Sequence, residues 1–487
     1  MSAFYSPVSP GTPAGPPARG FRSAIAVVLA LLPVVADFAR ADDALTRNTA
    51  AQTQPPNVLM IVSDDQAFGD YGFMGHPVIR TPHLDRLASQ SAVFRAGYTP
   101  TALCRPSLMS MITGLYPHRH RVTGNDPRQL PGMTPERFAE LRGQLIANVD
   151  SLSTIPRQLG QRGYVSMQTG KWWEGNYSRG GFTAGMTRGF PQPGGRHGDD
   201  GLEIGRKGLQ PLLNFISSAA ADRKPFFAWY APMLPHTPHN PPPRLLEKYR
   251  TEGRPVELAR YYAMVEWFDE TCGALLQHLE TTGLADQTLV VYVTDNGWIQ
   301  ATPQMQLSSA WTHGFAPRSK HSVYQGGIRT PILYRLPGRI RPADHPQLAS
   351  TLDVMPTVLQ VAGLDVPADL PGIGLLPFLS GQAELTRTTL CGEGYTHDVA
   401  DLNDPSASLL TRWCISGPWK LILSWDTPPD RYEFVHAGNE KTPQLYNLEQ
   451  DPEEQHNLAA QHPDIIIRLT QELARTWHVP RSPIAAE

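Results

Sequence analysis

The sequence is poor in cysteine, in net charge and in long apolar runs. Four cysteines in 487 residues are too few for a fold held together by disulfides. A formal net charge of −3 excludes the strongly basic surface of a nucleic-acid-binding protein and a polybasic membrane patch. The hydrophobic fraction of 41% and the charged fraction of 18% are typical of a globular protein, and the length suits one large domain or two ordinary ones.

The longest apolar run lies near the N-terminus and predicts an export signal. Residues 24–36 (AIAVVLALLPVVA) follow two arginines and are too few to cross a bilayer comfortably. The sequence ARA at 39–41 then offers a cleavage site with small residues. We expect a signal peptide over 1–41, with a membrane-anchoring helix as the alternative, and a flexible lead over 42–55. The mature chain is expected to be exported, periplasmic or secreted, without a transmembrane span.

Apolar strand-like runs alternate with helical stretches over the first two thirds of the chain. Strands are predicted at 57–62, 165–170, 225–231 and 288–297, and helices at 83–94, 153–164, 208–220 and 261–283. Such alternation is typical of an α/β fold, in which helices cover both faces of a mostly parallel sheet. We therefore expect a large α/β domain over 56–379.

The pattern changes from about residue 380. The segments 411–425 and 430–435 predict an antiparallel pair of strands, and 463–478 predicts a closing amphipathic helix. We expect a smaller C-terminal subdomain over 380–487. Cys391 and Cys414 lie in it and are candidates for a disulfide, although the sequence alone cannot show the pairing.

Oxygen donors follow two of the predicted strands. Asp64 and Asp65 end the first strand, and Asp295 and Asn296 end the strand near residue 290. In doubly wound sheets, ligands bind beyond the carboxyl ends of the strands. Carboxylates that meet there repel one another unless a cation lies between them, and oxygen-only ligands suit Ca²⁺ or Mg²⁺. Each pair alone is also a common turn sequence, but the two pairs together favour a metal site.

Basic side chains follow other predicted strands. Lys171 comes after the strand at 165–170, His236 after the strand at 225–231, and Lys320 lies in a Gly-rich loop before a further strand. Any one of them alone is more typical of a solvated surface. Beside a metal, two lysines and a histidine form a pocket for a charged oxyanion.

Cys104 stands at the start of a predicted helix. Pro106 suits the first turn, and Gly114 can end the helix. A thiol at a helix N-terminus faces free backbone N–H groups and the positive end of the helix dipole, which lower its pKa and also attract anions. The alternative is a buried, inert thiol.

These motifs, in this order, resemble those of the sulfatase family within the alkaline phosphatase superfamily. The matching segments are NVLMIVSDDQAFGDYG (57–72), CRPSLMSMITGLYPHRH (104–120), TGKWW (169–173), PHTPH (235–239), VTDNG (293–297) and KHSVYQGGIRTP (320–331). The segment 445–459 (LYNLEQDPEEQHNLA) resembles the tail of the family. The resemblance runs from about residue 55 to 477, and it implies an alkaline-phosphatase-like fold.

The resemblance also implies a reaction. In this family a maturation enzyme oxidises the motif cysteine, here Cys104, to formylglycine. One hydroxyl of the hydrated aldehyde attacks the sulfur of a sulfate ester, and the alcohol leaves. Deprotonation of the second hydroxyl then re-forms the aldehyde and expels sulfate. The substrate would be a sulfate ester of a small molecule or of a polysaccharide.

Individual roles are carried over by position. Asp64, Asp65, Asp295 and Asn296 would hold calcium, with magnesium as the alternative, and the modified Cys104 would complete the shell. The resemblance further implies that Lys171 and Lys320 neutralise sulfate oxygens. His236 would protonate the leaving oxygen.

Three positions depart from the family pattern. Leu108 replaces an arginine that supports maturation and the diol, Trp173 replaces a histidine that assists the second step, and Gln325 replaces a glutamate. The polar loop 194–205 contains His197, which could return an imidazole to the pocket; a solvated surface turn is the alternative. His118 and His120 are further candidates for the missing imidazole.

Two other functions stay open at this point. A metal and two lysines also suit phosphate, which leaves a phosphoester or phosphonate hydrolase of the same superfamily as an alternative. Leu108 and Trp173 motivate a catalytically impaired protein that binds sulfated glycans. The aromatic residues near the motifs could stack on a sugar or belong to the core: Trp172, Trp173, Tyr177, Trp298 and Trp311.

Overall fold

The structure is a computed structural model, and it describes residues 54–298, 318–428 and 441–484. The predicted signal peptide, Trp311 and the predicted strand at 430–435 lie outside these residues. Among the helices within them, none combines the length and apolarity that crossing a bilayer requires.

A large, mostly parallel sheet forms the centre of the fold. Its strand order is β10 (Ala343–His345), β2 (Ala92–Phe94), β9 (Ile332–Arg335), β8 (Thr288–Thr294), β1 (Asn57–Ser63), β7 (Phe226–Ala231), β5 (Val165–Gly170) and β6 (Ala184–Gly185). β9 runs antiparallel to β8 and β2, and the other pairs are parallel. The mixed α/β class expected from the sequence is confirmed.

The central strands are apolar because both faces of the sheet are covered. All seven residues of β1 are buried. Val58, Met60 and Val62 pack into one hydrophobic core, while Leu59 and Ile61 pack into the other. Successive side chains of a strand point to opposite faces, so a strand buried on both faces reads as a continuous apolar run.

Helices supply the other half of each core. Five contribute to the core that contains Val58: α3 (Cys104–Thr113), α5 (Pro135–Ala147), α6 (Ile155–Gly160), α11 (Val354–Val361) and α12 (Leu376–Leu379). Three others contribute to the core that contains Leu59: α2 (Pro82–Ser89), α7 (Gln210–Ala221) and α9 (Val256–Thr281). The remaining described α-helices before residue 380 are α4 (Pro117–His120), α8 (Pro243–Tyr249) and α10 (Gln325–Ile328).

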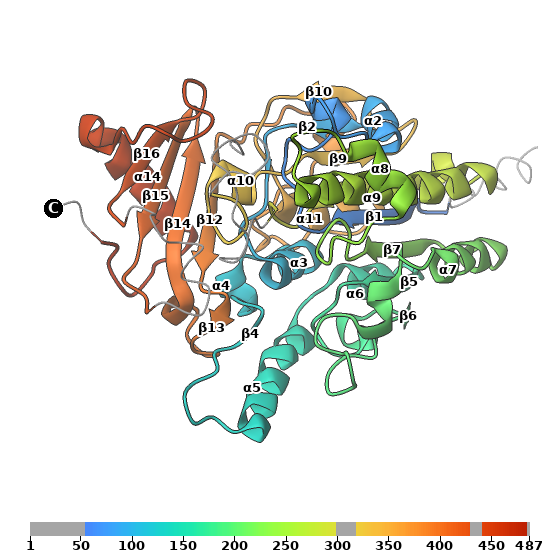
Figure 1. Ribbon diagram of the computed structural model, residues 1–487, viewed down its shortest axis with the longest axis horizontal. Helices are drawn as coiled ribbons and strands as arrows, with labels where there is room; N and C mark the ends of the chain where they lie inside the picture. Colours follow the sequence, from blue (N-terminus) through green and yellow to red (C-terminus); the bar gives the residue numbers. More distant parts are fainter. Residues whose placement is uncertain (1–53, 299–317, 429–440, 485–487) are drawn as a thin grey trace, which may run out of the picture. The chain divides into compact units, whose positions relative to one another are not determined.

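A second, antiparallel sheet follows in the C-terminal part (Figure 1). Its order is β12 (Thr389–Tyr395), β14 (Leu409–Ser416), β15 (Trp419–Ser424) and β16 (Gln444–Asn447). On one face, Leu421 and Leu445 pack with Leu469 and Leu473 of α14 (Pro463–Thr476). Residues on the other face pack with Tyr98, Val323 and Ile328, so this sheet contacts the segment that contains Lys320.

Short strand pairs connect parts of the chain that are distant in sequence. β3 (Gly97–Tyr98) pairs with β11 (Ala349–Ser350), and β4 (Asp126–Pro127) pairs with β13 (Asp398–Val399).

Cys391 and Cys414 are opposite residues of β12 and β14, and both are free thiols in this structure.

Three element predictions need correction. The segment 83–94 is not one helix, because α2 ends at Ser89 and residues 92–94 form β2, whose three residues are all buried. The helix predicted at 153–164 is shorter, since α6 ends at Gly160. The segment 411–425 is itself a hairpin, because Gly417 takes a left-handed backbone (φ 57°) between β14 and β15.

Candidate active site

The site forms where two adjacent parallel strands end. β1 and β8 pair in register from Asn57↔Thr288 to Ser63↔Thr294. The residues that follow the two strands therefore emerge side by side, and the amide N–H of Asp65 donates to Oδ1 of Asp295 over 3.1 Å. Asp65 has a left-handed backbone (φ 58°), a conformation that asparagine and aspartate tolerate better than most residues. This turn brings both aspartates of β1 toward Asp295.

Helix α3 brings Cys104 to the same point. The hydroxyl of Ser107 donates to the carbonyl oxygen of Asp295 over 2.6 Å and holds the start of the helix against the end of β8. One ligand atom from each of Asp64, Asp65, Cys104 and Asp295 lies within 4.8 Å of the others, and all four residues are buried. The sequence separates these residues by up to 231 positions, and the fold gathers them into one cluster.

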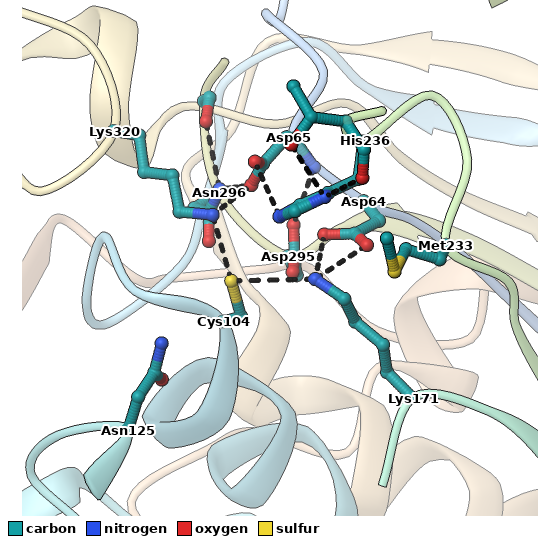
Figure 2. A network of polar contacts seen from close by, with 12 residues as sticks. Asp64, Asp65, Cys104, Asn125, Lys171, Met233, His236, Asp295, Asn296 and Lys320 are labelled. Atoms are coloured by element: carbon teal, nitrogen blue, oxygen red, sulfur yellow. Dashed lines mark hydrogen bonds and ion pairs between the residues drawn. The ribbon is translucent and has the colours of Figure 1, made fainter. Parts of the chain in front are cut away.

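Two lysines complete the cluster (Figure 2). Nζ of Lys171 lies 2.6 Å from both carboxylate oxygens of Asp64 and 3.7 Å from Sγ of Cys104. Nζ of Lys320 lies 2.9 Å from the same sulfur and forms an ion pair with Asp65. Both ammonium groups are therefore held next to Cys104, where they can bind the oxygens of an anion attached to or approaching that residue.

The electrostatics of the cluster leave one carboxylate without a balancing cation. Burial raises the pKa of Asp65, but Lys320, His236 and Lys171 outweigh it and hold that pKa well below its ordinary range. Asp295 has no comparable partner: burial and then Asp64 and Asp65 raise its pKa well above the ordinary value. Three buried carboxylates thus share two buried ammonium groups.

The donor set fits a hard divalent cation. Oδ2 of Asp295 and Oδ1 of Asn296 are buried and have no hydrogen-bond partner among the described residues. The amide nitrogen of Asn296 donates to Asp65 and to the carbonyl oxygen of Gly297, which leaves its oxygen as an available acceptor. Carboxylate and amide oxygens are the ligands that Ca²⁺ and Mg²⁺ prefer, so the residues present suit the ion that the sequence predicts.

Cys104 differs from the sequence expectation in one respect. Burial raises its thiol pKa to about 12, and this effect outweighs the nearby Lys171 and Lys320, which lower it. The expectation of a lowered pKa is therefore wrong, because it considered the helix N-terminus and not the depth of the site. A thiol with this pKa stays protonated near neutral pH and is a poor nucleophile.

His236 lies at the accessible side of the cluster. Its side chain is 21% exposed, whereas those of Asp64, Lys171 and Lys320 are 5% exposed or less. Nε2 lies 3.2 Å from Oδ2 of Asp65, and Nδ1 lies 2.7 Å from the carbonyl oxygen of Thr237. Burial and then Lys171 lower the pKa of the imidazole. A ligand that reaches the lysines from this side must pass His236.

The loop 194–205 places His197 beside Trp173. The two ring centroids are 5.3 Å apart, and Nζ of Lys171 lies 5.3 Å from the centroid of the same indole. The carbonyl oxygen of His197 accepts from the N–H of Trp172, which fixes the loop near Lys171. Nδ1 of His197 is buried without a hydrogen-bond partner among the described residues. Burial and then Lys171 and Arg196 lower the pKa of His197 to about 3.

Other sequence candidates lie away from the cluster. His118 pairs with Glu393, and Nε2 of His120 lies 3.1 Å from the hydroxyl of Ser110, so neither supplies the missing imidazole. Leu108 packs in the hydrophobic core.

The aromatic candidates belong mostly to the interior. Trp172 and Trp173 are buried, Tyr177 packs against the same core, and the ring of Trp298 stacks on Tyr261 at 3.7 Å. The ring of Trp173 lies near two predicted site residues, His197 and Lys171.

Sequence reasoning missed a buried ion pair next to Cys104. The guanidinium of Arg105 binds Glu174 in a bidentate arrangement, with distances of 2.7 and 2.6 Å, and also donates to the carbonyl oxygen of Asn125. The guanidinium of Arg105 is therefore engaged by Glu174 and does not take the place of the family arginine that Leu108 replaces. No local signal marks this pair, because its members are 69 residues apart. Met233, which Figure 2 shows beside Asp64, was missed as well.

The chain is similar to known proteins over most of its length. The family model described as Sulfatase matches residues 56–364, and the one described as N-sulphoglucosamine sulphohydrolase, C-terminal, matches residues 313–478. An N-acetylgalactosamine-6-O-sulfatase of Bacteroides thetaiotaomicron is 23% identical, over 92% of this chain and 98% of that protein. Human arylsulfatase A is 28% identical, over 86% of this chain and 87% of that protein.

Solved structures show the same fold. A structure in complex with its substrate, D-glucosamine-2-N,6-O-disulfate, matches with a TM-score of 0.66 and 19% identity, over 87% of this chain and 97% of that chain. The phosphonate monoester hydrolase of Agrobacterium radiobacter matches with a TM-score of 0.62 and 17% identity, over 89% of this chain and 100% of that chain.

Proposed function

The chain belongs to the sulfatase family, and from this premise we propose that it removes sulfate from sulfated carbohydrates. In this proposal Cys104 is converted to formylglycine, and the buried carboxylates bind calcium. The observation that carries the proposal is the cluster of Asp64, Asp65, Cys104 and Asp295, with Lys171 and Lys320 both in contact with the cysteine sulfur. The sugar class follows the names of the relatives, which include N-acetylgalactosamine-6-sulfatases.

Each residue of the cluster has a role in this proposal. Asp64, Asp65, Asp295 and Asn296 would hold calcium, with magnesium as the alternative ion, and the bound ion would supply a Lewis acid beside the reacting oxygens. Lys171 and Lys320 bind two sulfate oxygens and offset the charge that develops on them.

In this proposal two histidines transfer protons. His236, at the accessible side, donates a proton to the leaving alcohol oxygen. His197 lies beside Trp173 and Lys171, with a buried free nitrogen that can accept a proton from the converted Cys104. It thereby takes the place of the histidine that Trp173 replaces.

The charge of the cluster favours a sulfate ester over a phosphate monoester. Three carboxylates, two ammonium groups and a divalent cation leave one net positive charge. A sulfate monoester carries one negative charge and balances it, whereas a phosphate monoester carries about two at neutral pH. Phosphodiesters and phosphonate monoesters also carry one charge, so hydrolysis of these esters is the second candidate function.

We also propose the division of the chain that the sequence predicts. Residues 1–41 would be a signal peptide, 42–55 a lead, 56–379 the catalytic domain and 380–487 the C-terminal subdomain. The protein would then meet the formylglycine-generating enzyme before or during export.

One experiment tests the proposal most directly. Peptide mass spectrometry across Cys104, on protein from the native host, is combined with sulfate-release assays on sulfated sugars, and Cys104→Ala is the control. An aldehyde at this position and sulfate release that the control lacks are expected. An unmodified thiol together with active sulfate release would contradict the formylglycine. Tight binding of a sulfated oligosaccharide without turnover, by matured protein, would favour the binding-only alternative.

A further inference from the structure

Arg206 binds the backbone of the loop that carries His236. Its Nε and Nη2 donate to the carbonyl oxygen of Met233 over 3.0 and 2.7 Å, and Nη2 also donates to that of His236 over 2.8 Å. Nη1 donates to the carbonyl oxygen of Pro238 over 3.3 Å and to Oδ1 of Asn240 over 2.5 Å. One guanidinium thus contacts four acceptors on both sides of His236.

The loop has no regular secondary structure that would hold these carbonyl groups. Residues 232–242 lie between β7 and α8 and contain neither helix nor strand. At the start of the loop, the carbonyl oxygen of Leu234 accepts from the N–H of Asp64. This bond connects the loop to the turn that follows β1. Among the described residues, no backbone N–H donates to the carbonyl oxygen of Met233 or of His236. Arg206 therefore adds the main side-chain bonds to the backbone on both sides of His236, beside the contact of the imidazole with Asp65.

Arg206 is itself fixed by close packing on β7. Gly205 has a left-handed backbone (φ 78°), and a Cβ at this position would lie 2.7 Å from the hydroxyl oxygen of Tyr230. Only glycine allows the turn to approach the strand so closely. The N–H of Gly205 donates to the carbonyl oxygen of Gly208, and the guanidinium carbon of Arg206 lies 5.9 Å from the ring centroid of Trp267. The backbone at Gly205 and the ring of Trp267 thus fix the half-buried side chain of Arg206 in place.

We propose that Arg206 is a positioning residue that sets the location of the His236 imidazole against the leaving oxygen of the ester. The inference rests on the proposed role of His236 as proton donor. A guanidinium suits this task because its planar fork offers five donors in fixed directions, whereas a lysine offers three donors on a flexible stem. Because Arg206 contacts the loop that carries His236, it affects proton donation through that histidine.

The test compares two esters with different leaving groups. A sugar sulfate releases an alkoxide, which needs a proton, whereas 4-nitrophenyl sulfate releases a stabilised phenolate, which does not. In Arg206→Met, kcat for the sugar sulfate is expected to fall about 100-fold, in line with the loss of general acid catalysis, and kcat for the aryl sulfate by less than about 3-fold. Arg206→Lys, which keeps the charge and part of the bonding, is expected to lie between wild type and Arg206→Met.

A matched control separates positioning from general stability. Arg157 also donates to backbone carbonyl oxygens, those of Val149, Leu152 and Arg179, but not to the His236 loop. Arg157→Met is expected to lower Tm and to affect both esters alike. An equal loss for both esters in folded Arg206→Met or Arg206→Lys would overturn the proposal.

A second measurement does not depend on turnover. Hydrogen–deuterium exchange of peptides covering 232–242 is expected to accelerate in both Arg206 variants and to stay unchanged in Arg157→Met. Unchanged exchange in the Arg206 variants would overturn the proposal. If the wild type cleaves neither ester, the proposed function fails, and the exchange result alone decides whether Arg206 holds the loop. If Arg206→Met does not fold, Arg206→Lys carries both comparisons.

Discussion

The buried pair Arg105–Glu174 allows a quantitative prediction about the helix that carries Cys104. The two side chains are 1% and 2% exposed and form two parallel hydrogen bonds. Arg105→Met removes one partner and leaves the carboxylate of Glu174 buried and unpaired. Removing one member of such a pair costs about 3–5 kcal/mol of unfolding free energy. Replacing both members by apolar side chains, in Arg105→Met with Glu174→Leu, is expected to cost only about 0–2 kcal/mol, because no buried charge remains.

The expected change in Tm follows from the size of the protein. An unfolding entropy of about 2.1 cal/mol/K per residue gives about 0.8 kcal/mol/K for roughly 400 ordered residues. A loss of 3–5 kcal/mol therefore lowers Tm by about 4–6 °C in the single variant, and the double variant recovers most of this loss. Differential scanning calorimetry of the two single variants, the double variant and wild type completes a double-mutant cycle.

An exposed pair provides the control for this cycle. Arg137 and Glu140 form an ion pair with side chains 53% and 56% exposed, and Arg137→Met is expected to cost less than about 1 kcal/mol, since water screens such pairs. If the double variant at 105 and 174 were as unstable as the single variants together, the two groups would not be coupled, and the reasoning from burial would be refuted.

Two further predictions concern the metal and the second histidine. Asp295→Asn is expected to abolish the calcium-dependent rise in Tm, which in wild type corresponds to about 2.7 kcal/mol at a calcium concentration of 100 times Kd. The control Asp369→Asn, at a side chain that is 69% exposed, should keep this rise. Stoichiometric calcium binding by Asp295→Asn in calorimetry would contradict the metal assignment. His197→Ala is expected to lower kcat for sulfate release about 10- to 100-fold, with a smaller change in KM, because the proton acceptor is lost. The control His456→Ala, at a side chain that is 82% exposed, should turn over like wild type. Wild-type turnover by His197→Ala would show that the imidazole has no role.

Much of the large sheet could be predicted from local sequence. β1, β7 and β8 are continuous apolar runs because both faces of the sheet are covered, and such runs are visible without any tertiary information. The boundary between α2 and β2 was missed because residues 83–94 keep helical spacing throughout. The hairpin of β14 and β15 was missed although Ser416, Gly417 and Pro418 form a turn signal between its two apolar halves.

The sequence by itself determined the chemical inventory of the protein. Polar residues directly after buried strands identified Asp64, Asp65, Asp295 and Asn296, since strand ends are where chains of this fold class expose functional groups. The order of the motifs gave the family. These features are local, so each can be read from a few neighbouring residues.

Only the tertiary structure decided which groups meet and how they behave. Lys320 and Cys104, 216 residues apart, share one contact, and Arg206 reaches a loop 30 residues away. The sequence suggests a lowered thiol pKa for Cys104, but the fold raises it to about 12 by burying the sulfur. Desolvation and long-range ion pairs depend on everything packed around a group, and no short stretch of sequence contains that information.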